Sequence, residues 1–404
     1  MKEEKIMILS MLQEGKITSE EAVKLIEALE ELENPNTTSE SESTYTKFNK
    51  EQSKTNKVLN KTLDEIGSDI SSAFTNIFSG LKDLGSSLGI NTNSTTHTVD
   101  LEKDLSEIEC PILDLRAING SITLRQSSSQ TIRMKVNIQY KNEIVDPNKE
   151  LYKFYIDGNR VIFTPIYNND ISIKLDIAIP NRKYEKIILN STNGKISVQD
   201  LDTNLLNIDT TNGSIVITDI ASNDINLSTK NGKIDCVNIK SNTIKLATTN
   251  SCIDISDIQS TTIEAITANS KINIRDITSS TIICRTSNNT VEARDISSEI
   301  INLTTSNGKI VISDIDFAKA KDVRLLTSNG SINSEIHNIS KEAYIDLETS
   351  MGNINLEIPN LVYTTNKQIN LGIKKIIAHS INYDENQEHL NFIASTSNGS
   401  INIF

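Results

Sequence analysis

The sequence predicts a mainly β protein: a β-solenoid (β-helix-like) of ~19-residue rungs, preceded by a small N-terminal α-helical hairpin and an amphipathic linker helix. The first observation is a corner Asn that recurs every nineteen residues from Asn193 to Asn307 and is followed by Gly in four of the seven rungs. The second is a short alternating apolar run after each corner, which is the period of a strand with one buried face. The third is a composition rich in Ile, Thr, Ser and Asn, with 4% aromatic residues and no Trp. Such residues favour strands and turns.

Charge and cysteine usage exclude several classes of protein. The 404 residues carry a formal net charge of −13, whereas a nucleic-acid-binding protein needs a basic stripe. We therefore expect no nucleic acid partner. Cys110, Cys236, Cys252 and Cys284 form no CxxC pair, and the four histidines lack ligand spacing. The cysteines are interpreted as small core or turn residues, and no metal or cofactor is expected.

Residues 1–34 are predicted to form a helical hairpin for oligomerisation or docking. Apolar residues such as Ile6 and Leu9 lie at helical spacing in its first half. Thr18 begins a capping box with Glu21 at the start of the second half. Two helices of this length cannot bury both apolar stripes alone. We expect the hairpin to associate with itself or with a protein partner.

Residues 35–57 are polar and predict a flexible linker, and residues 58–90 then predict an amphipathic helix. The face expected to meet a membrane or partner comprises Leu63, Ile66, Ile70, Phe74, Ile77, Phe78, Leu81, Leu84 and Leu88. Its opposite face is mostly Ser, Thr, Asn and Gly, which is typical of helices that insert into loosely packed membrane surfaces. The same stripe also fits a coiled-coil seam or a cap over the end of the following β-domain.

Residues 97–404 are predicted to form the solenoid, irregular up to about residue 190 and periodic afterwards. The expected corner ladder comprises Asn193, Gly194, Asn212, Gly213, Asn231, Gly232, Asn250, Asn269, Asn288, Asn307, Gly308, Asn329 and Gly330. With the Asn as position zero, positions three and five are apolar, position seven is usually Asp, and positions thirteen and fifteen are mostly apolar. Position seventeen is Thr. One unit is therefore corner, strand, corner, strand.

Stacking these units would align like residues in columns. Asn side-chain amides could then bond from rung to rung. We expect Gly to supply the positive φ of a sharp corner, and Asn to tolerate the left-handed region in the rungs that lack Gly. Asn329 and Met351 follow at steps of twenty-two residues, which predicts three-residue insertions in one corner, and Asn398 marks the final rung.

The Asp column at position seven is the sharpest candidate for chemistry. Stacked carboxylates repel, and a cation would relieve that repulsion. The nine-residue repeat of calcium-binding β-rolls is missing, however, and Asp at a strand end commonly bonds its own turn backbone. A structural role is therefore favoured over cation binding. The chain has no nucleophile elbow, HExxH motif, phosphate loop or dinucleotide fingerprint, so no enzyme is predicted.

Two stretches resemble known families. "DIAIPNRKYEKIILNSTNGKISVQDLDTNLLNIDTTNGSIVI" resembles the bacterial putative-adhesin family of repetitive β-domains, and this likeness covers roughly residues 97–404. "MLQEGKITSEEAVKLIEALE" resembles the helical hairpin at the front of LiaX/YvlB-like proteins. Together they are similar to a cell-envelope-stress group associated with responses to membrane-damaging antibiotics. The resemblance brings no catalytic residues.

The expected function is a non-enzymatic scaffold or sensor of the bacterial cell envelope stress response, acting by protein or membrane-surface contacts. A surface adhesin that presents the solenoid face to a ligand is the alternative, and a carbohydrate-active β-helix is a remote one. The start of the chain lacks a signal-like apolar region, and no run of eighteen apolar residues occurs. This pattern predicts a cytoplasmic location with membrane or envelope association.

Overall fold

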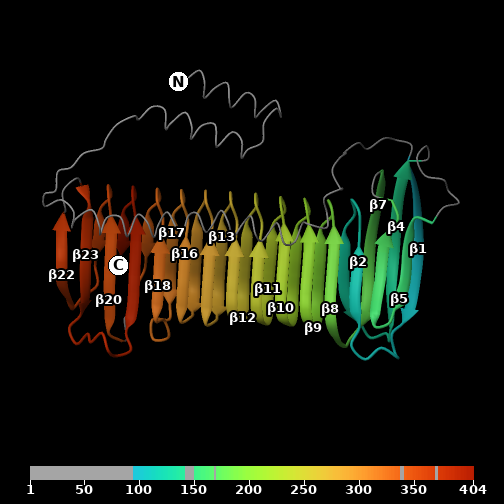
Figure 1. The fold of residues 1–404 in the computed structure, drawn as a ribbon, viewed down its shortest axis with the longest axis horizontal. Helices are drawn as coiled ribbons and strands as arrows, with labels where there is room; N and C mark the ends of the chain where they lie inside the picture. The colour runs from blue at the N-terminus through green and yellow to red at the C-terminus, as the bar shows by residue number, and fades with distance from the viewer. Residues whose placement is uncertain (1–93, 142–149, 168–169, 337–340, 369–371) are drawn as a thin grey trace, which may run out of the picture. The chain divides into compact units, whose positions relative to one another are not determined.

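The computed structural model describes residues 94–141, 150–167, 170–336, 341–368 and 372–404. The predictions for residues 1–34, 35–57 and 58–90 lie outside these ranges. Within the described ranges the chain forms 25 β-strands and no α-helix. The mainly β fold predicted from composition and period is confirmed. Strands that recur along the chain stack side by side as a β-solenoid (Figure 1).

Each rung contributes one strand to each of two sheets, which we call face A and face B. Face A holds the strands that follow the Asn corner: β3 (Ile122–Ser127), the first halves of β9 (Ile196–Thr210), β10 (Ile215–Thr229), β11 (Ile234–Ala247) and β12 (Ile253–Ile266), then β13 (Ile272–Thr278), β15 (Val291–Ser297), β17 (Ile310–Ile315), β19 (Ile332–Ser334), β25 (Ile401–Ile403) and β21 (Ile354–Leu356). Face B holds β2 (Ile112–Arg116), β8 (Lys183–Ser191), the second halves of β9–β12, β14 (Thr281–Arg285), β16 (Ile300–Thr304), β18 (Asp322–Leu326), β24 (Leu390–Thr396) and β20 (Ala343–Thr349). The pairing is parallel, and β10, β11 and β12 align in register at nineteen-residue steps.

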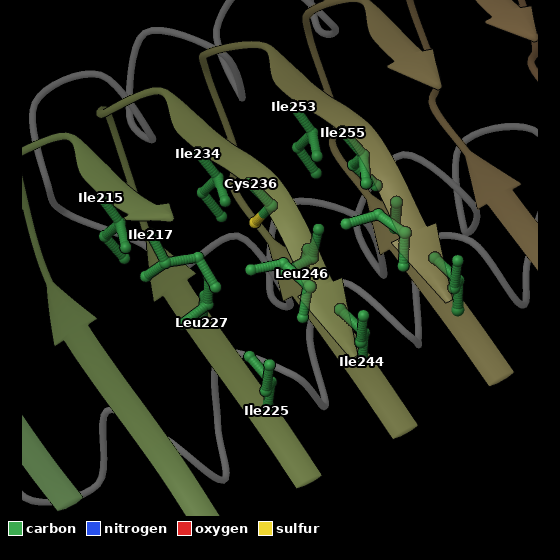
Figure 2. Close-up of a cluster of buried hydrophobic side chains, with 14 of the residues drawn as sticks. Ile215, Ile217, Ile225, Leu227, Ile234, Cys236, Ile244, Leu246, Ile253 and Ile255 are labelled. Carbon is green, nitrogen blue, oxygen red and sulfur yellow. The ribbon is translucent and has the colours of Figure 1, made fainter. Parts of the chain in front are cut away.

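The core lies between the two faces, as the period of two predicts. In β10, Ile215 and Ile217 point inward from face A, and Ile225 and Leu227 meet them from face B (Figure 2). All four are at most 1% exposed. Burying one such side chain is worth about 1.5–3 kcal/mol, and stacking adds further layers of the same kind. The Cys236 side chain occupies a core position between Ile217 and Ile255.

The predicted asparagine ladder is confirmed at the first corner. Asn231 Nδ2 donates to Oδ1 of Asn212 at 2.6 Å, and Asn269 Nδ2 donates to Oδ1 of Asn250 at 2.8 Å. Nine such bonds connect Asn119, Asn193, Asn212, Asn231, Asn250, Asn269, Asn288, Asn307, Asn329 and Asn398 in this order. Identical amides at rung spacing can each donate to one neighbour and accept from the other.

The role predicted for the corner glycines is wrong. Gly158 and Gly372 are the only glycines with positive φ in the described residues, and neither belongs to a repeated Asn-Gly corner. A Cβ built on Gly232 would instead lie 1.7 Å from the carbonyl oxygen of Gly213 in the preceding rung. Glycine is therefore favoured at the corners where the backbones of successive rungs approach this closely, whereas Ser251, Ser270 and Asn289 take the equivalent position in other rungs. Asn119 is the one ladder asparagine with positive φ, so tolerance of the left-handed region does not explain the ladder.

Positive φ belongs to the second corner, at position seven. Its left-handed residues are Asp200, Asp219, Asn238, Asp257, Asp276, Asp295 and Asp314, with φ between 52° and 57°. Asp and Asn adopt this conformation more readily than other residues with a side chain. The Asp column therefore marks a backbone turn between face A and face B.

Side-chain hydroxyl groups satisfy backbone groups at both corners. Thr229 Oγ1 accepts a hydrogen bond from the Gly232 amide at 3.1 Å and donates to the Gly213 carbonyl at 2.9 Å. At the other corner, Ser241 Oγ lies 3.1 Å from the Thr243 carbonyl, its acceptor in the same rung. Backbone groups buried in a solenoid corner need such partners, because an unmet polar group is costly.

The stacking order departs from the chain order at both ends, contrary to the sequential stack that the repeat predicts. The rung formed by β2 and β3 lies between β6 (Arg160–Pro165) and β7 (Ile171–Pro180) on one side and β8 and β9 on the other. At the far end, β24 and β25 insert between β18 and β19 and the pair β20 and β21. The three-residue insertion after Ile315 is confirmed as a turn at Asp316–Lys319.

Antiparallel strands close both ends. Face A ends in β7, β4 (Thr131–Lys141) and β1 (Ser94–Asp104), and face B ends in β6 and β5 (Tyr152–Asp157). At the other end, β23 (Lys374–Ser380) pairs with β20 and β22 (Leu361–Gln368) pairs with β23. Over the described part of the chain, no helix is long and apolar enough to cross a membrane.

Candidate binding surfaces

The described residues contain no cluster of three or more His, Cys, Asp or Glu side chains that could hold a metal ion. The residues of the Asp column adopt the left-handed conformation of the second corner, and most of their side chains are exposed to solvent. Asn238 Nδ2 donates to Asp219 Oδ1 within this column. The other predicted ladder, of Asn and Gly, has its side chains committed to neighbouring rungs. Both columns are therefore structural.

All four cysteines are free thiols. Cys236 and Cys284 are fully buried, and burial raises the pKa of Cys284 to about 12 and that of Cys236 further. A nucleophilic cysteine needs a lowered thiol pKa. The two core cysteines therefore act as small apolar residues, as predicted.

A cleft of about 720 Å³, lined by both apolar and charged side chains, lies between the edge strands β1 and β5. We call it the end cleft. Val99 and Leu101 of β1 and Tyr152 and Phe154 of β5 line it and are half-buried. The Tyr152 ring stacks on Phe163 with centroids 5.1 Å apart. The aromatic wall is therefore anchored on the core.

The end cleft exists because both sheets stop here. Among the described residues, β1 pairs with β4 and β5 pairs with β6, so each strand has a free edge. A solenoid that ends in this way exposes the last layer of its core unless a cap covers it. Lys103 reaches over the Phe154 ring at 5.8 Å and shields part of the layer.

A second hollow, which we call the charged groove, lies on the outer side of face A. It has a volume of about 500 Å³ and alternates basic and acidic side chains over rungs β11 to β15. Lys233 Nζ lies 2.8 Å from Asp235 Oδ2 and 2.7 Å from Asp254 Oδ2. The hydrogen bonds that Lys233 donates to these two carboxylates raise the pKa of Lys233 above its usual range.

Sequence reasoning located neither surface. The strands of the end cleft alternate like any others, and the cleft follows from which strands remain at the edge. The charged groove has a signal in the sequence, because basic residues recur at position six of consecutive rungs. The membrane or partner face predicted at Leu63, Ile66, Ile70, Phe74, Ile77, Phe78, Leu81, Leu84 and Leu88 lies outside the described residues.

Comparisons with known proteins identify two parts of the chain. Residues 110–274 match the Toastrack family, DUF4097, and residues 3–34 match a SHOCT-like domain. No curated protein matches the chain.

The similar solved structures share little sequence with the chain. A putative cell adhesion protein from Clostridium sporogenes is 12% identical, with 76% of this chain and 99% of that chain covered and a TM-score of 0.23. A putative adhesin from Bacteroides fragilis is 11% identical, with 76% and 97% covered and a TM-score of 0.31. A putative lipid binding protein from Parabacteroides distasonis is 14% identical, with 78% and 98% covered and a TM-score of 0.31. Residues 110–274 of the repeated β-domain are therefore similar to the Toastrack family, and the strand register shows that this domain is a β-solenoid.

Proposed function

We propose that this chain is a non-enzymatic binding protein of the bacterial cell envelope stress response, a scaffold or sensor that contacts a membrane surface or a protein partner. The end cleft is the observation that carries the proposal. It offers half-buried apolar surface between β1 and β5, and residues 58–90 end just before β1 begins. The long run of ladder-linked rungs behind the cleft would serve as a rigid support.

The chain itself links the two apolar surfaces. Residues 91–93 can span at most about 10 Å, because an extended residue covers about 3.3–3.6 Å. The apolar stripe of residues 58–90 is therefore tethered close to the start of β1 at Ser94. Two weak apolar contacts held this close reinforce each other through effective concentration. A loosely packed membrane surface would suit the Ser- and Gly-rich polar face of the stripe.

The SHOCT-like segment supplies a second contact in this proposal. Its match covers residues 3–34, the segment predicted to pair with another copy or another protein. An acidic hairpin, with nine Glu against four Lys over residues 1–34, would favour a basic partner. The stress-response assignment rests on the resemblance of this hairpin and the solenoid to LiaX/YvlB-like proteins.

We propose no enzymatic activity. The charged groove does cluster carboxylates and basic residues, as a carbohydrate-active β-helix would require. Lys233 is paired with Asp235 and Asp254, however, and a general acid has to keep a proton near neutral pH, which an ion pair disfavours. The lining of the groove also contains no aromatic platform for a sugar.

Liposome flotation tests the membrane part of the proposal. We expect the full chain to float with vesicles of loosely packed, unsaturated lipid, because apolar stripe residues bury there. Deletion of residues 58–90 should abolish flotation, and Phe154→Asp should reduce it several-fold. Lys174→Gln on the exposed side of β7, outside the lining of the end cleft, serves as the control. Equal recovery of the full chain and the 58–90 deletion would contradict the proposal.

The adhesin alternative is favoured by the charged groove, which presents a patterned polar face to solvent. In that function the solenoid face binds a ligand outside the cell. Cell fractionation separates the two functions, since an adhesin has to be found at the cell surface. Protein found only in the cytosol excludes the adhesin.

A further inference from the structure

Two arginines face each other across neighbouring rungs of the charged groove. The register pairs Arg275 of β13 directly with Arg294 of β15. Both side chains are exposed, and neither makes an ion pair with a described residue. The same position in the other nineteen-residue rungs holds neutral residues, Gln199, Thr218, Val237, Ser256 and Ser313, and in the two rungs after them it holds Glu335 and Glu357. The arginine pair is therefore a local departure from the repeat.

The carboxylates of the groove are already engaged by lysines. Lys233 contacts Asp235 and Asp254, and Lys271 Nζ lies 2.5 Å from Glu292 Oε2. Four basic and three acidic side chains line the groove, so it carries a surplus positive charge within a chain of net charge −13. That surplus is concentrated at the two arginines. An incoming anion therefore meets no competing free carboxylate among the described lining residues.

Like charges placed directly opposite on adjacent strands destabilise a sheet. Strands in a sheet lie about 4.8 Å apart, so the register places the two arginines side by side on adjacent strands, within reach of one shared anion. A guanidinium presents a planar fork of N–H donors that matches the oxygens of phosphate or carboxylate. One anionic group between the forks would accept hydrogen bonds from both and remove the repulsion.

We propose that Arg275 and Arg294 form a binding site for an anionic oxygen group, a phosphoryl or carboxylate group carried by a soluble ion, a lipid headgroup or a polymer. The open shape of the groove along the rungs suits a chain-like anion, whose successive charges would follow the stacking direction. This site lies on β13 and β15 and uses no residue of the end cleft. The result of testing this site is therefore independent of the membrane contact proposed above for the end cleft.

The test compares Arg275→Gln/Arg294→Gln with the wild-type full chain. The matched control is Lys240→Gln/Lys245→Gln, which removes the same charge from exposed lysines elsewhere in the solenoid. Three probes are used at low salt: inorganic phosphate, sodium polyphosphate, and vesicles containing phosphatidylglycerol. Binding to the two soluble probes is measured by titration calorimetry, and binding to vesicles by sedimentation. The melting temperature of each ligand-free protein is also recorded.

We expect wild type to bind at least one probe and the arginine double variant to bind it about tenfold or more weakly, since the variant loses the charge-assisted hydrogen bonds of both guanidinium groups. The lysine control should stay within about twofold. The probe that binds identifies the source of the anion. Without ligand, the arginine variant should melt higher than wild type because the repulsion is gone. Failure of wild type to bind any probe, or equal binding by wild type and the arginine variant, would overturn the proposal.

Discussion

At the scale of single residues, space and hydrogen bonding decide which side chains the corners accept. Gly232 is needed because its neighbour's carbonyl oxygen occupies the place of a Cβ. Thr229 is needed because one hydroxyl serves two rungs. Both columns are visible in the sequence. The sequence alone does not show whether a corner glycine is needed for a positive φ or because the backbones of neighbouring rungs approach closely. That distinction depends on the distance between rungs.

Gly232→Ala tests this account of the corner. The added methyl group would meet backbone rather than a flexible side chain, so the rungs have to separate. Overpacking of this kind costs about 1–3 kcal/mol. We expect the urea midpoint to fall accordingly. Ser270 occupies the equivalent position in another rung and already has a Cβ. Ser270→Ala adds no atom at that corner, so it should change the urea midpoint little. Equal effects of the two substitutions would show that space at the corner does not limit the choice of residue.

Asp209 makes the stability of the solenoid depend on pH. Burial raises its pKa to about 7, well above that of an unfolded Asp near 4. The native state therefore holds this proton more tightly than the unfolded state, so the contribution is present below pH 4 and is lost as pH rises to about 7. Because Asp209 is partly exposed, we estimate the loss at about 2 kcal/mol.

Asp209→Asn isolates this effect from the other carboxylates. The amide cannot ionise, so its unfolding free energy should decline less between pH 4 and 7 than that of wild type. Urea unfolding at several pH values provides the measurement. Parallel pH profiles for the two proteins would mean that Asp209 stays ionised in the folded state.

At the scale of elements, the sequence predicts the strands and core positions within each rung. It does not predict the order in which the rungs stack at the two ends of the solenoid. Nineteen-residue columns place Ile215, Ile234 and Ile253 in register, and the structure agrees. The final rung carries the same column pattern, so it could stack on either neighbour equally well by pattern alone. Its position between β18 and β20 is decided by long-range pairing. The end cleft escaped prediction for the same reason.

Removal of residues 390–404 tests the inserted rung. β24 contributes Leu390, Phe392 and Ala394 to the core, all fully buried. Without them, β18 and β20 lose a shared parallel partner, and the segment around residues 341–380 should be cleaved rapidly in limited proteolysis. Rungs β9 to β16 should stay protected, because solenoid stability is summed over nearest neighbours. Removal of Phe404 alone, which is exposed, provides the control. Uniform cleavage of the whole solenoid would contradict this local view.

At the scale of the whole molecule, the proposed functions depend on the parts that break the repeat. In the periodic rungs, the Asn and Thr side chains form hydrogen bonds with neighbouring rungs, and the Asp residues form the second corner. The end cleft and the arginine pair are the departures that face outward, and each needed the register or the sheet edges to become visible. The acidic charge of the chain repels anionic surfaces in general. Contact with a membrane therefore has to be local, through the apolar residues of the end cleft or through the surplus positive charge at the arginine pair.

Hydrogen–deuterium exchange of the full chain, with and without vesicles of unsaturated lipid, tests the central claim most directly. A binding surface at the end cleft predicts slower exchange in residues 58–90, β1 and β5 when vesicles are present. The strands from β9 to β16 should exchange at unchanged rates. Slowing confined to the periodic rungs, or no slowing anywhere, would contradict the claim that this end of the solenoid is the binding end.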